Sequence, residues 1–171
     1  MDGQINPSPE ATAPRAQAAA DPDIAALLAL AAEADAALMR GDSRGYDALV
    51  RHTDDFTLMS PFGGPPTHGF DRSGERLAAL GRFFVNGVTG RQEVVQTYAC
   101  ADMVVLVLIE RPYVEVGGLP AQEWPLRVSL VFCREGDTWC LAHRHADPLV
   151  HGISIEHAAM LARGEQARGE V

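Results

Sequence analysis

The stretch from Thr138 to Val150 carries the densest group of side chains that could do chemistry. It alternates for the length of a strand, so it presents two rival faces, of which only one can look into the interior of a fold. One face carries two histidines and a carboxylate, and the other carries an arginine among small residues: Trp139, Leu141, His143, His145 and Asp147 against Cys140, Ala142, Arg144 and Ala146.

The histidine face leaves three interpretations open. A carboxylate can hold the tautomer of a neighbouring imidazole, which makes His145 and Asp147 a candidate catalytic acid/base pair if their face is the inner one. His143 and His145 could also ligate zinc or iron, with His68 or His52 as a further ligand. Alternatively, the histidines cap the strand and form hydrogen bonds at a subunit interface. Because nothing in the sequence sets the spacing of a third ligand, we expect no metal and no cofactor.

The arginine face suggests anion binding. If it is the inner face, the alternation of side chains that we expect along the preceding strand places Arg127 and Ser129 on the same face as Arg144. A guanidinium group binds carboxylates through two parallel hydrogen bonds, which predicts a pocket for a small organic acid. In the competing interpretation, both arginines pair with Glu110 or Glu123 and only neutralise buried charge.

Helices and strands predicted around this stretch give an α+β domain. Apolar residues at helical spacing predict helices over 24–40, around Tyr46, over 73–84 and over 155–163. Apolar or alternating runs predict strands over 54–60, 93–100, 103–116, 124–133 and from Thr138, the last two joined by a turn at 134–137. Helices precede a meander of strands, which is typical of helices packed on one face of an antiparallel sheet.

The length of 171 residues suits one domain. We expect a disordered leader at 1–20, a folded domain at 21–164 and a polar tail at 165–171. A formal charge of −9 argues against binding to nucleic acid or to anionic membranes. Three cysteines without CxxC spacing, and no signal-like or membrane-spanning run, predict free thiols and a cytoplasmic protein.

Two predicted strands are apolar on both faces, at 104–109 and 128–133. A single layer of helices covers only one face of a sheet, and exposed apolar area of that size is rare in monomers. The second face therefore predicts a homodimer.

The order of elements and three local features resemble a known superfamily. Gly41-Asp42 follows the first long helix, Asp54-Asp55-Phe56 opens the first strand, and Trp139 precedes His143-Arg144-His145 at the end of the last. Over residues 24–150 this resembles nuclear transport factor 2-like proteins, in particular the SnoaL-like proteins and the association domain of calcium/calmodulin-dependent kinase II. The resemblance implies a cone-shaped fold of helices on a curved sheet around a deep pocket, usually in a dimer, and it leaves the chemistry open.

The resemblance also implies roles for individual residues. It makes the arginine face the pocket face, so that Arg144, Arg127, Ser129 and Ser60 would bind substrate, with His143 nearby. Separately, the Gly- and Pro-rich segment 61–66 predicts a loop at the pocket mouth, with Phe62 lying over the ligand. The positions that correspond to the groups of steroid isomerases hold Ser60, Ser129 and Ala34, none of which keeps the required group. We therefore expect a small-molecule-binding protein, as a cofactor-independent isomerase, cyclase or dehydratase, or else a non-catalytic ligand-binding or assembly module.

Overall fold

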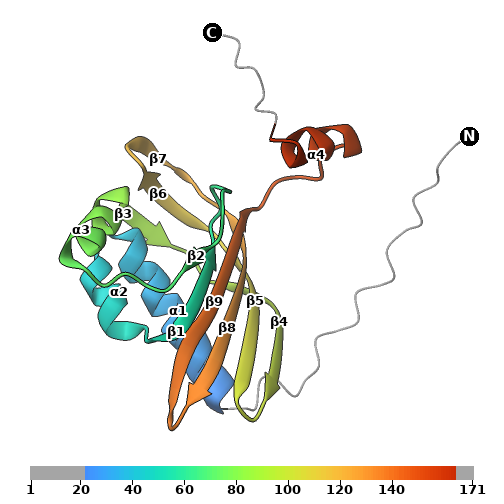
Figure 1. The fold of residues 1–171 in the computed structure, drawn as a ribbon. Helices are drawn as coiled ribbons and strands as arrows, with labels where there is room; N and C mark the ends of the chain where they lie inside the picture. The colour runs from blue at the N-terminus through green and yellow to red at the C-terminus, as the bar shows by residue number, and fades with distance from the viewer. Residues whose placement is uncertain (1–21, 165–171) are drawn as a thin grey trace, which may run out of the picture.

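The computed structural model describes residues 22–164, which form one α+β body with an outlying helix (Figure 1). Its helices are α1 (Pro22–Met39), α2 (Ser43–Leu49), α3 (Gly74–Phe83) and α4 (Ile155–Ala162). Its strands are β1 (His52–Met59), β2 (Thr67–His68), β3 (Phe84–Thr89), β4 (Glu93–Cys100), β5 (Met103–Glu110), β6 (Pro112–Val116), β7 (Leu119–Glu123), β8 (Leu126–Glu135) and β9 (Thr138–Pro148). The predicted leader and tail lie outside the described residues.

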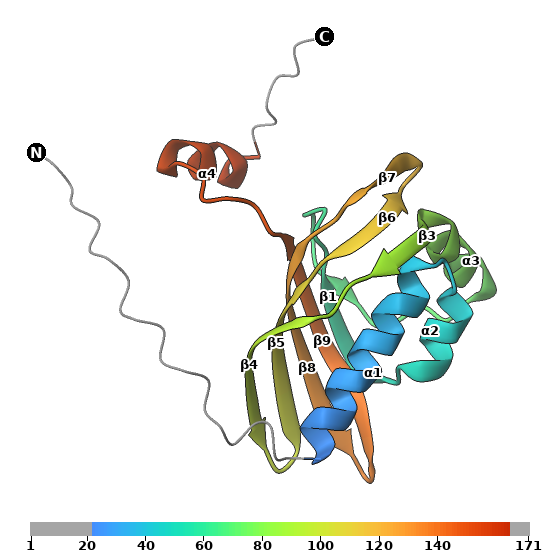
Figure 2. The same ribbon diagram turned by 180° about the vertical axis from the view of Figure 1, so that it is seen from behind.

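The strands form two sheets. The main sheet has the order β2-β1-β9-β8-β5-β4, and the small sheet has the order β3-β6-β7. Only the β1–β9 pair is parallel. Figure 2 shows α1 lying across one face of the main sheet, which we call the inner face, whereas Figure 1 looks onto the opposite, outer face. The predicted α+β class and helix-on-sheet arrangement are confirmed.

The first helix packs on the sheet because its apolar residues recur at helical spacing. Ile24, Leu27, Ala31 and Ala34 are all buried against the inner face. The helix stops at Gly41, whose φ of +82° favours glycine, and an added Cβ there would lie 2.7 Å from a backbone oxygen of α3.

The next two helices each begin at a side chain that caps their first turn. The Asp42 carboxylate accepts a hydrogen bond from the backbone N–H of Gly45 at 2.8 Å, and Ser73 caps α3 in the same way. Tyr46 and Leu49 of α2 pack against the same core as the buried residues of α1.

One long predicted strand, 103–116, is in fact two strands in different sheets. β5 ends at Glu110, and β6 begins at Pro112, which cannot donate a hydrogen bond to a ladder and so marks the change of sheet. The predicted loop after it is a hairpin, because Gly117 and Gly118 have φ of +58° and +86° and allow β6 to pair with β7.

The predicted third helix is one residue too long at its end, and the strand after it was not expected. The apolar pair Phe83-Phe84 continued the helical pattern in the sequence, but Phe84 already pairs with Val116 in β3. Partners far along the chain decide this boundary, and local spacing does not contain that information.

The last helix stands apart from the body. Figure 1 shows α4 beyond the end of β9, and none of its residues is buried. Within residues 22–164, no helix combines the length and the apolar character that crossing a membrane requires.

Candidate functional site

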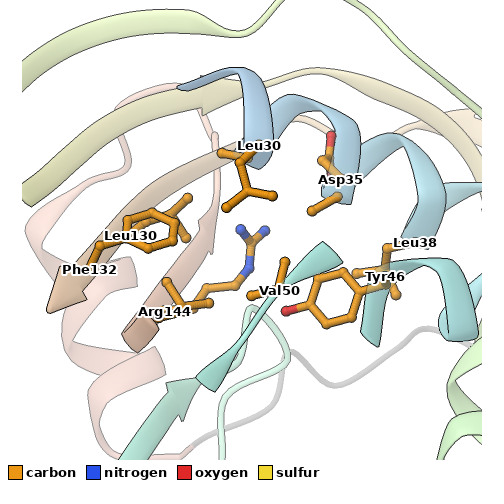
Figure 3. A pocket seen from close by; sticks show the side chains of 11 residues that line it. Leu30, Asp35, Leu38, Tyr46, Val50, Leu130, Phe132 and Arg144 are labelled. Atoms are coloured by element: carbon orange, nitrogen blue, oxygen red, sulfur yellow. The ribbon is translucent and has the colours of Figure 1, made fainter. Parts of the chain in front are cut away.

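A small cavity lies between α1, α2 and the inner face of the main sheet (Figure 3). Its volume is about 40 Å³, which is room for a few water molecules or a very small ligand, far less than the pockets that hold drug-sized molecules. The walls are apolar apart from three side chains: Leu30, Ala31, Ala34, Leu38, Val50, Leu130, Phe132 and Leu141 surround Asp35, Tyr46 and Arg144.

Asp35 on α1 is the most unusual of the three polar residues. It is only 7% exposed, and among residues 22–164 no side chain or backbone group forms a hydrogen bond or ion pair with its carboxyl group. Burial, with a further contribution from the Glu110 carboxylate, raises the pKa of Asp35 to about 7, although Arg144 acts in the opposite direction. The cavity therefore contains a carboxyl group that changes charge near neutral pH.

Arg144 on β9 is held by Glu110 on β5. The guanidinium Nη2 donates to Glu110 Oε2 at 2.8 Å and Nη1 donates to Oε1 at 3.3 Å. Glu110 is 1% exposed and also accepts from Gln92 Nε2 at 3.4 Å. Burial opposes the charge on Arg144, yet the neighbouring Glu110 carboxylate raises the pKa of the guanidinium above its usual value. Both terminal nitrogens of Arg144 are thus already engaged by a protein carboxylate.

Tyr46 on α2 completes the polar groups. Its hydroxyl lies 3.3 Å from Nε2 of His52. Burial raises the pKa of Tyr46 to about 12 in spite of the nearby Arg144, so the phenol stays protonated. Figure 3 shows the hydroxyl end of the Tyr46 ring directed toward the Arg144 side of the cavity.

The predicted partners of Arg144 on β8 lie on the opposite face. In the β8–β9 register, Leu130 pairs with Arg144, whereas Ser129 pairs with His145 and Arg127 pairs with Asp147. Directly opposed residues of an antiparallel pair share a face of the sheet. The residues of β8 that were expected on the inner face therefore lie on the outer face, a shift of one residue. Arg127 and Ser129 therefore do not converge on Arg144.

The outer face holds the remaining polar residues of β9. His143 Nδ1 lies 2.7 Å from the hydroxyl of Thr57 on β1. His145 Nε2 and Arg127 Nη2 each lie 3.4 Å from an oxygen of Asp147. None of these side chains lines the cavity beneath α1, and residues 22–164 contain no cluster of three or more side chains suited to hold a metal ion.

The two residues proposed near the pocket mouth lie away from the cavity. Ser60 Oγ accepts a hydrogen bond from the backbone N–H of Phe62 at 3.2 Å. The Phe62 ring is 52% exposed and contacts Phe83 and Trp124, with ring centroids 5.3 and 5.7 Å apart. The loop at Phe62 therefore packs on aromatic rings at the end of α3 and between β7 and β8.

Sequence reasoning missed Asp35 as a site residue, although a signal was present. Asp35 follows Ala31 by four positions, so it interrupts the apolar stripe of α1 with a carboxylate on the buried face. Ala34, compared above with a steroid isomerase position, is its direct neighbour and also lines the cavity. From the sequence, Tyr46 was identified only as a residue of a predicted helix. Glu110 was identified only as a possible ion-pair partner of Arg127 and Arg144.

Known proteins resemble the chain in structure only. No protein-family model matches the sequence, and no curated protein does either. Solved structures match over most of their length, at identities that establish the fold alone.

Three of these structures illustrate the range. A Thiobacillus denitrificans protein, provisionally described as a calcium/calmodulin-dependent protein kinase type II association domain, has a TM-score of 0.56 and 20% identity, with 71% of this chain and 94% of that one covered. An NTF2-like protein of unknown function from Pseudomonas putida has a TM-score of 0.56 and 18% identity, covering 78% and 89%. A Streptomyces avermitilis protein of the NTF2-like family, provisionally described as a dehydratase, has a TM-score of 0.54 and 20% identity, covering 74% and 94%.

These matches confirm the expected fold. The chain has the nuclear-transport-factor-2-like fold.

Proposed function

We propose that the protein binds a small molecule in the cavity beneath α1 and transfers a proton to or from it without a cofactor. The observation that carries this proposal is Asp35, a buried carboxyl group without a protein partner that titrates near neutral pH. A general acid/base works best when its pKa lies close to the operating pH, because both protonation states are then populated.

The surroundings of Asp35 support this role. As a carboxylate it can take a proton from a bound molecule, and as a carboxylic acid it can return one to another atom, which covers isomerisation and dehydration. Apolar walls keep bulk water away from the cavity. The Arg144–Glu110 ion pair stays ionised and fixed in position beside the reacting group. The cavity's size limits the part of a substrate that it can enclose in this conformation to a few heavy atoms.

The test is a search for catalysed proton transfer in deuterated water. The full chain is incubated with small neutral alcohols, ketones and aldehydes, and deuterium uptake at carbon and loss of water are followed by NMR. We expect turnover in the native protein and none with Asp35→Asn. The matched control, Asp147→Asn, removes an outer-face carboxylate and should leave turnover unchanged; activity that survives Asp35→Asn would sink the proposal.

A second candidate function is self-assembly through the outer face, which one specific observation favours. In Figure 1 no described helix lies over this face, and Val105, Val107, Ile109 and Val131 there are only half buried. Tyr98 beside them is 59% exposed. Large uncovered apolar surfaces favour a partner, and some structures with the same fold are association domains by name. We propose a homodimer formed by two outer faces, with His143 and His145 at its polar part.

A cytoplasmic location also remains a proposal. Cys100, Cys133 and Cys140 are free thiols in the structure, a state that a reducing compartment preserves.

A further inference from the structure

Two of the three free cysteines lie opposite each other across the β8–β9 hairpin, away from the cavity. In the register of this antiparallel pair, Cys133 is the direct partner of Cys140. Directly opposed residues of an antiparallel pair share a face of the sheet, with Cα atoms about 4.5–5.5 Å apart. Disulfide bonds span Cα distances of about 4.4–6.8 Å, so the spacing of these two strands suits a disulfide.

An irregularity in β9 brings the second thiol to this position. The pairing of β8 with β9 skips Ala142, and an extra residue of this kind exchanges the faces of the residues beyond it. Leu141 accordingly lines the cavity on the inner face, and Cys140 lies on the outer face with Cys133. Strict alternation along the strand would instead have placed Cys140 on the inner face with Arg144.

A hydrogen bond confirms that the two thiols share a face. Cys140 Sγ donates to Oε2 of Glu135 at 3.6 Å, and Glu135 lies two residues beyond Cys133 on the same side of β8. Cys133 is half-buried, whereas Cys140 is only 2% exposed. A small molecule from solution can therefore reach Cys133 first, with the second thiol directly behind it and a carboxylate in place to accept the proton of that thiol.

The third cysteine lies in the same row but too far away. Cys100 on β4 pairs with Met103 on β5, and Met103 pairs in turn with Cys133. Neighbouring strands are about 4.8 Å apart, so the Cα atoms of Cys100 and Cys133 are separated by roughly 9–10 Å, with a methionine between them. A disulfide cannot span that distance. Within one chain, only Cys133 and Cys140 are placed to form a disulfide.

We propose that Cys133 and Cys140 form a reversible redox pair, which closes to a disulfide by exchange with a low-molecular-weight disulfide such as oxidised glutathione. The thiolate of Cys133 attacks one sulfur of the small disulfide, so a mixed disulfide forms and one small thiolate leaves. The thiolate of Cys140 then attacks Sγ of Cys133 and expels the second small thiolate. The two protein protons pass to the two leaving thiolates, and the small disulfide gains the two electrons that the protein loses.

The closed pair acts on the hairpin that carries Arg144. A bond between two opposed residues permits a single register of β8 on β9, and this register sets which side chains lie on the inner face. The inference is independent of the proposed function, because neither Cys133 nor Cys140 lines the cavity.

The test uses the full chain, reduced beforehand and kept dilute so that self-association through the outer face does not cover Cys133. The protein is incubated with mixtures of reduced and oxidised glutathione, the remaining thiols are alkylated in denaturant, and tryptic peptides are identified by mass spectrometry. Trypsin cuts after Arg127, Arg134 and Arg144, so the proposed disulfide joins the peptides 128–134 and 135–144.

We expect the linked peptides to appear as the oxidised fraction of glutathione rises and to separate again with dithiothreitol. Burial, with smaller contributions from nearby carboxylates, raises the pKa of both thiols. Because only the thiolate attacks, the linked peptides should form about tenfold faster at pH 8 than at pH 7. Their absence with oxidised glutathione alone, or a disulfide at Cys100 in their place, would overturn the proposal.

Single variants test the order of the two attacks. In Cys140→Ala, Cys133 should accumulate the glutathione adduct, because no second thiol resolves it. In Cys133→Ala, the buried Cys140 should stay unmodified, and the matched control Cys100→Ser should behave as the native protein does. Equal adduct on Cys140 and on Cys133 in these variants would contradict the proposed order. The linked peptides of the native protein decide whether the pair closes, even if a variant folds poorly.

Discussion

The inner and the outer face of the main sheet each carry an ion pair between an arginine and a carboxylate. On the inner face Arg144 pairs with Glu110, and their side chains are 19% and 1% exposed. On the outer face Arg127 pairs with Asp147, and theirs are 58% and 44% exposed. Two neighbouring strands, β8 and β9, supply three of these four residues, so the two pairs differ in their environment far more than in their sequence neighbourhood.

The difference shows how burial turns ordinary residues into a site. Charges in water are screened and interact weakly, whereas buried charges must be paired or change their protonation state. Asp35 illustrates the second case, since its burial raises its pKa to about 7. Four substitutions test this comparison, from the largest expected effect to the smallest.

Glu110→Gln should have the largest effect, because it leaves the buried guanidinium of Arg144 without its counter-charge. We expect the free energy of unfolding to fall by about 3–5 kcal/mol at pH 7, measured by urea denaturation. Asp147→Asn is the matched change on the outer face and should cost less than about 1 kcal/mol. Equal losses at the two sites would show that the inner pair is not buried as described.

Asp35→Asn should stabilise the protein at alkaline pH. The folded-state pKa of about 7 lies above the ordinary aspartate value of 3.8, so between these two pH values the folded state holds a proton that the unfolded state has lost. The stability that protonated Asp35 contributes is therefore fully present below about pH 3.8 and is lost as pH rises through about 7. Asparagine does not ionise, so at pH 8 the variant should gain on the order of 3 kcal/mol over the native protein.

Near pH 4 that advantage should vanish, which urea denaturation at both pH values can establish. An Asp35→Asn variant that is no more stable than the native protein at pH 8 would contradict the burial of an ionisable group at this position.

Val107→Asp should disrupt assembly through the outer face. A charge placed on an apolar interface costs roughly 2–3 kcal/mol, so self-association should weaken by about a hundredfold in analytical ultracentrifugation. Val88→Asp is the control, because Val88 is 66% exposed on β3 of the small sheet. A native protein that sediments as a monomer, or association unaffected by Val107→Asp, would rule out the proposed interface.

His52→Phe should change how stability depends on acid. The pKa of His52 in the folded protein is about 4, below its ordinary 6.5, so the unfolded state binds a proton first. The contribution of the neutral ring is present above about 6.5 and is lost as pH falls through about 4. Because His52 is partly exposed, we expect a difference of only about 1 kcal/mol between pH 7 and pH 4, which the phenylalanine variant should lack.

The sequence predicted the architecture better than the site. Helical spacing, Gly41 and the alternation of β9 were sufficient for most of the elements, whereas the inward orientation of Arg144 came from the resemblance to nuclear transport factor 2-like proteins. The face of each β8 residue depends on the pairing register across the hairpin, including an irregularity between Val131 and Phe132, and a shift of one residue exchanges the faces. The sequence pattern therefore could not separate Arg127 from Arg144.

The acid/base group was hidden for a different reason. Asp35 is unusual only because α1 packs its buried face against a sheet that contributes Glu110 from far along the chain. The burial of Asp35 and its closeness to Glu110 arise from tertiary contacts. The sequence of α1 by itself shows only one carboxylate among the apolar residues of its buried face. An acidic residue at such a position is the signal worth following in other sequences.

The most direct test of the account is the titration of the Asp35 carboxyl group in the native protein, followed by carbon-13 NMR with Asp35→Asn to assign its resonance. We expect a midpoint near pH 7, which should shift downward in Glu110→Gln because the Glu110 carboxylate helps to raise the pKa of Asp35. A midpoint near pH 4, the ordinary value for an aspartate, would contradict the claim that the cavity beneath α1 holds an acid/base group.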